Sequence, residues 1–172
     1  MNKLLTDFDG VLLRTEFAKS LEWFIASLAI QGKVYPCFTD RLARNETEAL
    51  EQVKKVLDGH FDEFEKMKSI SGMSRKDTRD AVWRLMNYSG TEYTSSDLER
   101  IRGRIKFPLE SHYSERIEGN MGFFQEAKKR GLELGLITQA KEEEIRRLTS
   151  AKELCLDDIF QRIECIGDDF YK

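Results

Sequence analysis

The stretch LLTDFDGVLL, residues 4–13, places two aspartates on either side of one aromatic residue, between two short apolar runs. On a β-strand, side chains two residues apart point to the same side, so Asp7 and Asp9 can face one site where a strand ends. Two neighbouring carboxylates repel each other and need a cation or a shared proton. Mg²⁺ fits, because it takes oxygen ligands and keeps several water molecules. We therefore expect residues 3–8 to form a strand that ends at a ligand-binding acid pair.

A turn rich in aspartate and glycine is the main alternative for this motif when it is considered alone. An aspartate that caps a helix beginning at Gly10 is a second alternative, and it is compatible with a chemical role. A calcium-binding loop is excluded, because Val11 occupies the fifth position from Asp7 and the glycine falls at the fourth. The turn and the ligand-binding pair both remain open on the motif alone.

The rest of the chain divides into two regions of different pattern. From residue 16 to residue 116, apolar residues recur at helical spacing and no strand pattern is visible. After Ile117 we expect a helix, the apolar strand LELGLIT at 132–138, a charged helix and a short strand, RIECI. Helices that alternate with apolar strands indicate an α/β fold with a parallel sheet.

Local signals predict where some helices begin and end. Asn45, with Glu48 three residues later, predicts a helix start. Ser96 is expected to cap a later helix that ends before Pro108, since proline breaks a helix interior.

Composition narrows the class of protein. The chain has 172 residues, is 34% charged and carries a net charge of −3, with acids and bases mixed along it. This mixture argues against a nucleic-acid or membrane-surface partner, which needs a clustered basic face. No signal peptide is visible, and the apolar stretch from Trp23 to Ile30 is too short to cross a bilayer. An odd number of widely spaced cysteines without C-x-x-C predicts reduced thiols in a cytoplasmic protein; they are Cys37, Cys155 and Cys165.

The motifs in their order resemble the haloacid dehalogenase-like (HAD) hydrolases. DFDGVL at 7–12 resembles their first motif, D-x-D-G-[VT]-[LV]. The helical insert is similar to the cap of the phosphoglycolate phosphatase and β-phosphoglucomutase branch. Three further stretches resemble that branch: SGMSRKD at 71–77, IEGNMGFFQEAKKRGLELGLIT at 117–138 and LCLDDIFQRIECIGDD at 154–169. The resemblance implies a Rossmann-like three-layer parallel sheet core from residues 1–15 and 117–172, with an all-helical cap at 16–116.

The same resemblance implies roles for the site residues and a Mg²⁺ cofactor. Asp7 would be the nucleophile that forms an aspartyl-phosphate, and Asp9 would be the general acid and base. Thr138 would hydrogen-bond a phosphate oxygen, together with backbone N–H groups at Gly10 and Gln139. The family usually has asparagine where this chain has Gln139.

The third and fourth motifs of the family lie near the end of the chain. Lys172 is the best match to the lysine that neutralises the phosphate, while Lys141 and Lys152 are expected to be solvated helix charges. The family completes its Mg²⁺ site with further acids after another strand. Asp168 and its neighbour Asp169 resemble that motif, but their order places them in the loop before the lysine. They are therefore weaker metal-ligand candidates than Asp7 and Asp9.

Without the insert, the core is marginal in size for an independent domain and would leave a parallel strand with an open edge. We therefore expect a fragment, a shortened gene product, or a chain completed by self-association or by another segment. The expected function is a Mg²⁺-dependent phosphatase that acts on a small phosphorylated metabolite. The alternatives are a phosphomutase and a catalytically inactive binding or regulatory module. Arg14, Arg75 and Lys76 are possible substrate contacts, although solvation is the favoured interpretation for each.

Overall fold

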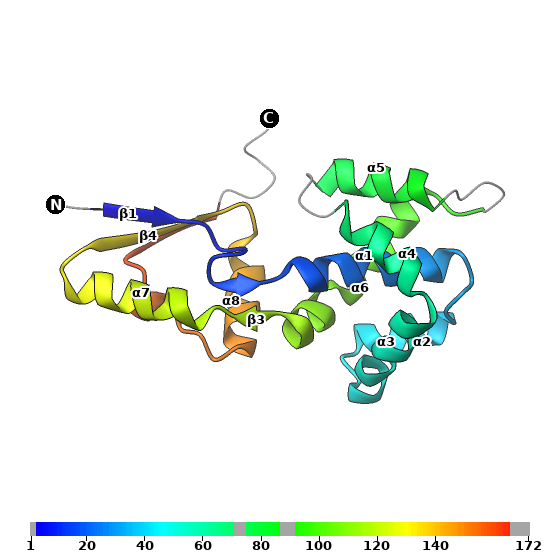
Figure 1. Cartoon of the computed structure of the whole chain (residues 1–172), viewed down its shortest axis with the longest axis horizontal. Helices are drawn as coiled ribbons and strands as arrows, with labels where there is room; N and C mark the ends of the chain where they lie inside the picture. The colour runs from blue at the N-terminus through cyan, green and yellow to red at the C-terminus, as the bar shows by residue number, and fades with distance from the viewer. Residues whose placement is uncertain (1–2, 71–74, 87–91, 166–172) are drawn as a thin grey trace. The chain divides into compact units, whose positions relative to one another are not determined.

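The computed structural model describes residues 3–70, 75–86 and 92–165 (Figure 1). The chain forms two compact units. The core unit combines Met1–Thr15 with Ser114–Lys172, and the helical unit is Glu16–Tyr113. The second boundary lies at residue 114, three residues before the position expected from sequence. Each unit is described separately below.

The core unit contains a parallel sheet with strand order β1-β4-β5. Its strands are β1 (Lys3–Thr6), β4 (Glu133–Thr138) and β5 (Arg162–Cys165). Leu4 of β1 is paired with Leu134, and Leu136 is paired with Ile163 of β5. Helix α7 (Glu118–Lys129) connects to β4, and α8 (Glu142–Ala151) with the short η1 (Leu156–Asp158) connects β4 to β5. The predicted α/β class is confirmed.

One face of this sheet is covered by both helices (Figure 1). Strand side chains alternate in direction, so every second residue of β4 points the same way. Leu134 and Leu136 are fully buried against a core that includes Phe124 of α7 and Ile145 of α8. Burial of this apolar surface is what stabilises the layer of helices against the sheet.

The opposite face carries a small apolar centre bordered by ion pairs. Leu5 of β1 lies over Gly135, and its side chain is 61% exposed. Lys3 pairs with Glu133 at 3.3 Å on the same face, and Arg162 of β5 pairs with Glu164. The described part of the core unit thus shows two of the three layers expected from sequence.

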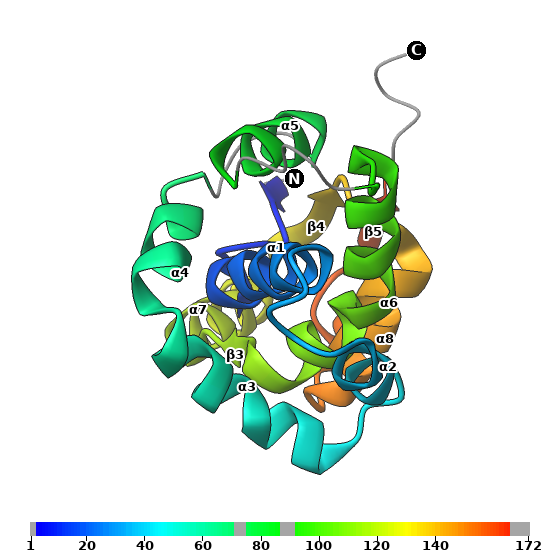
Figure 2. The same cartoon turned by 90° about the vertical axis from the view of Figure 1, so that its right-hand side faces the viewer.

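The helical unit is built around α1 (Glu16–Ile30), which is buried on nearly every side. Figure 2 shows α1 end-on, with the other helices of the unit around it. Apolar side chains from each described helix form one core with α1. The surrounding helices are α2 (Pro36–Ala43), α3 (Thr47–Gly59), α4 (Phe61–Lys68), α5 (Arg75–Leu85) and α6 (Ser95–Tyr113). None of the described helices is long and apolar enough to cross a bilayer.

A small antiparallel ladder lies where the chain passes between the two units. Strand β2 (Leu13–Arg14) pairs with β3 (Glu115–Arg116), with Leu13 opposite Arg116. The sequence predicted no strand between residues 16 and 116, and for β3 this was wrong. A strand of two residues is too short to show an alternation of apolar and polar residues. Its pairing with a segment about a hundred residues away therefore cannot be predicted from the local sequence.

Two predicted helix starts differ from the structure. Asn45 adopts a left-handed backbone with φ 59°, and its N–H donates to the Leu42 carbonyl at 2.8 Å. It therefore ends α2, and α3 begins two residues later. The cap of α6 is Thr94, not Ser96: the Asp97 carboxylate accepts from the Thr94 N–H at 2.9 Å. The bonds from Thr94 lower the pKa of Asp97 to about 2.

The predicted end of α6 before Pro108 was also wrong, because the helix continues through this proline to Tyr113. Proline removes one backbone hydrogen bond from a helix. Here Pro108 and Leu109 are both buried in the helical unit, so tertiary packing compensates for the lost bond.

All three cysteines fall in described segments and are free, as the sequence predicted. Cys37 of α2 and Cys155 before η1 are exposed. Cys165 at the end of β5 is partly buried, and this burial raises the pKa of its thiol.

Candidate active site

Two predicted site segments follow neighbouring parallel strands. Asp7 comes directly after β1, and Thr138 is the last residue of β4. The strands stay paired to Thr6 and Leu136, so their carboxyl ends lie side by side (Figure 1). Ligands of open α/β sheets bind at such an edge.

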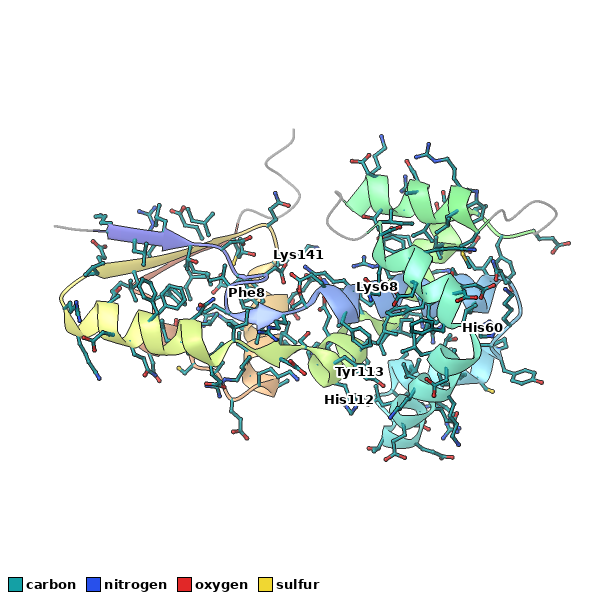
Figure 3. All side chains as sticks on the ribbon, viewed as in Figure 1. Phe8, His60, Lys68, His112, Tyr113 and Lys141 are labelled. Carbon is teal, nitrogen blue, oxygen red and sulfur yellow. The ribbon has the colours of Figure 1, made fainter. Side chains whose placement is uncertain are left out.

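The chain turns sharply after β1, two residues before the predicted strand end. Phe8 is 2% exposed and packs into the core beneath the sheet (Figure 3). Its carbonyl accepts from the Leu12 N–H at 2.9 Å, which closes the turn. Phe8 anchors the loop, and the two flanking aspartates stay outside the apolar core.

Gly10 gives this turn its geometry. Its φ of 71° lies in the left-handed region that glycine adopts without strain. Its N–H donates to the Leu13 carbonyl at 2.8 Å. The Gly10 amide is therefore engaged within the turn, and phosphate binding by backbone N–H groups near Gly10 stays a prediction.

Asp7 and Asp9 have different surroundings. Asp7 is exposed, and one of its carboxylate oxygens accepts from the Phe8 N–H at 2.7 Å. Asp9 is half-buried, and its Oδ1 accepts from the Thr15 hydroxyl at 2.8 Å. Thr15 is 1% exposed, so the position of its hydroxyl is fixed by packing. One carboxylate is thus accessible from solvent, and the other is held in place.

Thr15 was missed at the sequence level. The only local signal is a hydroxyl residue directly before the helical run of α1. Asn120 was missed as well: its side-chain amide donates to the Val11 carbonyl at 2.9 Å and ties the loop to α7. These two partners lie 109 residues apart in the chain, so no local pattern could indicate the contact.

The Thr138 hydroxyl is buried and accepts from the Ala140 N–H at 3.2 Å. A hydroxyl oxygen that accepts one hydrogen bond keeps its own proton for another acceptor. Gln139 is exposed, and Lys141 is exposed at the start of α8 (Figure 3). The first turn of α8 carries three glutamates, which already complement the positive end of that helix.

Further candidate residues were named from the sequence, besides Lys152. Lys172, Asp168 and Asp169 lie outside the described residues. Arg14 and Lys76 are exposed, as expected for solvated charges, and for Arg75 only the backbone is described.

Lys152 differs from the prediction of a solvated helix charge. It is half-buried at the end of α8, and this burial lowers the pKa of its ammonium group. The nearby Glu115 carboxylate acts in the opposite direction and raises it.

The carboxylates of Asp7 and Asp9 can hold part of a Mg²⁺ shell. No group of three or more His, Cys, Asp or Glu residues suitable for a metal occurs within residues 3–70, 75–86 and 92–165. Mg²⁺ is usually bound through one or two carboxylates, with water and phosphate oxygens completing the shell. Asp7 and Asp9 are the carboxylates that the sequence offers for this role within the described residues.

No protein-family model matches the chain, and no curated protein matches its sequence significantly. Among solved structures, a Thermotoga maritima protein assigned as a beta-phosphoglucomutase matches with a TM-score of 0.61 and 16% identity, over 96% of this chain and 62% of that one. A Bacillus subtilis protein assigned as the HAD-hydrolase YfnB matches with a TM-score of 0.50 and 16% identity, over 94% of this chain and 63% of that one. Its structure is described as bound to magnesium and as revealing interdomain movement. The chain thus spans just under two thirds of the length of both proteins, and at this identity the likeness concerns the fold.

Proposed function

The chain has the fold of the HAD-like hydrolases, and on that premise we propose that it hydrolyses a phosphate ester of a small metabolite with the help of Mg²⁺. One observation carries the proposal. An exposed aspartate and a positioned aspartate follow β1, beside a buried threonine hydroxyl at the end of β4.

Asp7 is the nucleophile in this proposal, because its carboxylate is accessible from solvent. A carboxylate oxygen of Asp7 forms a bond to phosphorus, and the bond from phosphorus to the ester oxygen breaks. Water then attacks the aspartyl-phosphate, which releases inorganic phosphate and restores the Asp7 carboxylate. In each step one bond to phosphorus forms and one breaks, and water is the one reactant besides the ester.

Asp9 moves the proton in both steps. It gives a proton to the departing ester oxygen and later takes one from the attacking water. The hydrogen bond from Thr15 fixes the position of its Oδ1 for this work. Asp7 and Asp9 would also hold Mg²⁺, which when bound offsets the negative charge of the phosphate oxygens.

Thr138 binds the phosphate in this proposal. Its oxygen accepts from Ala140, so its O–H can be donated to a phosphate oxygen. The helical unit supplies the cap over the substrate, and closing it would exclude bulk water. Lys172 remains a proposed second cation for the phosphate.

A phosphomutase is the second candidate, and the name of the Thermotoga maritima structure favours it. In that case a sugar hydroxyl, in place of water, takes the phosphoryl group from Asp7. If the phosphoryl group is transferred to a second sugar hydroxyl faster than inorganic phosphate is released, the result supports the phosphomutase over the phosphatase.

Hydrolysis of an aryl phosphate by the chain, with and without added Mg²⁺, tests the proposal. We expect turnover that depends on Mg²⁺ and an acid-stable phosphoryl adduct on the peptide that contains Asp7. The variant Asp7→Asn should lose this turnover. Its matched control is Asp58→Asn, since Asp58 is an exposed aspartate of α3. Binding of a phosphate mimic without any turnover would support the inactive binding module and contradict the phosphatase.

Thr15→Val is expected to lower kcat by about 10- to 100-fold, because a hydrogen bond to a charged group contributes about 1.5–3 kcal/mol. KM should change little, since Thr15 acts through Asp9 and does not contact the substrate. Steady-state kinetics over a range of substrate concentrations measures both quantities. Thr15→Ser keeps the hydroxyl and should restore most of the rate; equal losses in both variants would contradict the positioning role.

A further inference from the structure

An aromatic ring is partly open to solvent at the start of the helical unit. Phe17 is the second residue of α1, and its side chain is 39% exposed, although most of this helix is buried. A single exposed apolar residue is common on protein surfaces and needs no explanation by itself. Phe17 differs from such a residue in how firmly its ring is held and in its place along the chain.

Two neighbouring rings fix the orientation of the Phe17 ring. Its centroid lies 5.5 Å from that of Phe64 at an interplanar angle of 77°, and 5.9 Å from that of Tyr113 at 64°. Both are edge-to-face contacts, which stabilise an aromatic pair beyond the area that it buries. Phe64 is 2% exposed, so it is a fixed base on which Phe17 packs. The exposed part of the Phe17 ring therefore rests on a rigid support.

Tyr113, at the end of α6, is also held in place. Its hydroxyl donates to the Leu50 carbonyl of α3 at 2.8 Å. Burial raises the pKa of this phenol above its usual value, so Tyr113 stays neutral at neutral pH. With its hydroxyl proton engaged, Tyr113 is a rigid apolar neighbour of Phe17 (Figure 3). We refer to Phe17, Phe64 and Tyr113 as the aromatic platform.

The covalent chain limits how far the aromatic platform can lie from Asp9. Phe17 follows Thr15 by two residues, and two residues span at most about 7 Å between their Cα atoms. The Thr15 hydroxyl in turn donates to Asp9 at 2.8 Å. Tyr113 comes shortly before β3, and β3 pairs with β2 in the same stretch of chain as Thr15. Two separate stretches of chain thus tie the platform to the segment that carries Asp9.

The role of Asp9 indicates what the platform would contact. In the proposed mechanism Asp9 gives a proton to the departing ester oxygen, so the alcohol part of the substrate begins at Asp9, and the present inference rests on that function. We propose that the exposed part of the Phe17 ring stacks against a ring in this alcohol. The protein then prefers phosphate esters of ring-containing alcohols to those of short acyclic alcohols. Phe17 is a specificity-determining residue and takes no part in the bond-making steps.

The chemistry of the platform favours a ring over a short chain. A ring held by Phe64 and Tyr113 has already lost its rotational freedom, so stacking on it costs little further conformational entropy. A ring in the substrate removes apolar surface of both partners from water. A short acyclic alcohol has too few carbon atoms to cover the exposed part of Phe17.

The kinetics of two matched substrates test the proposal. Benzyl phosphate carries a ring and ethyl phosphate does not, while both are esters of primary alcohols, whose departure needs a proton. Phe17→Ala is expected to lower the benzyl-to-ethyl ratio of kcat/KM by about 5- to 20-fold. Most of this change should appear in KM for benzyl phosphate, because stacking acts equally on the bound substrate and on the transition state.

Two variants are the controls for this ratio. Phe17→Tyr keeps a ring of the same shape and should keep the ratio of the wild type. Phe61→Ala removes a ring of α4 that is 55% exposed and lies outside the platform, and it should keep the ratio as well. Equal losses on both esters in Phe17→Ala, or the same change of ratio in Phe61→Ala, would overturn the stacking role.

Binding of two phosphonates separates this inference from the proposed function. Benzylphosphonate and ethylphosphonate mimic the two esters but cannot be hydrolysed. We expect the wild type to bind benzylphosphonate more tightly, and Phe17→Ala to lose this preference; Phe17→Leu keeps apolar volume in the fold and replaces it if Phe17→Ala does not fold. A chain that hydrolyses neither ester but keeps the preference contradicts the phosphatase and supports the stacking role. Equal affinity of the wild type for both phosphonates overturns the stacking role even if the esters are hydrolysed.

Discussion

Asp7→Asn is expected to lower the rate of phosphate-ester hydrolysis by at least about 10³-fold, because an amide cannot take over the role of the attacking carboxylate. The change is small in volume and falls on an exposed side chain, so the fold should be retained. Turnover of an aryl phosphate, together with the urea midpoint of the variant, measures both effects. Activity that persists in a correctly folded Asp7→Asn protein would rule out the aspartyl-phosphate mechanism.

Asp9→Asn provides the matched comparison, since the same substitution two residues away should leave a different kinetic pattern. An aryl alcohol departs readily without a proton, whereas an alkyl alcohol needs one. We expect the loss of rate on alkyl phosphates to exceed the loss on aryl phosphates by about tenfold or more. With an aryl substrate, a burst of released alcohol should precede slow turnover. Equal losses on both classes of substrate would contradict the assignment of Asp9 as the general acid.

Phe64→Ala should lower the unfolding free energy of the helical unit by about 3–5 kcal/mol. This is a large fraction of the total unfolding free energy of a small domain, about 5–15 kcal/mol. The Phe64 ring is 2% exposed and makes edge-to-face contacts with Phe17 at 5.5 Å and Phe24 at 5.3 Å. Its removal leaves a cavity next to the buried helix α1. Urea unfolding followed by tryptophan fluorescence measures the loss.

The control for this prediction is Phe61→Ala on the same helix. Phe61 is 55% exposed, so its truncation should change the unfolding free energy by no more than about 0.5 kcal/mol. Similar losses for both variants would show that α4 does not pack on α1 as described.

The order of the elements was predictable because it depends on local patterns. Apolar residues at helical spacing predicted α1, and the compact run before Thr138 predicted β4. The position of Asp7 and Thr138 at the ends of two parallel strands was predictable too, since the carboxyl ends of neighbouring parallel strands share one edge. In each case a pattern within one short stretch of sequence determines the type of element and where it ends.

The errors came from contacts that depend on distant partners. Pro108 stays inside α6 because the helix is buried there, and β3 exists because it pairs with β2. Thr15 and Asn120, which position the candidate site, carry no motif of their own.

The two exposed thiols fall one in each unit, Cys37 in the helical unit and Cys155 in the core unit. Burial raises the pKa of the third thiol, Cys165, and thereby lowers the share of its reactive thiolate at neutral pH. The natural chain can therefore accept a pair of spin labels without any engineered cysteine. Pulsed dipolar spectroscopy on such a doubly labelled protein would then measure the distance between the two labels with and without a phosphate mimic.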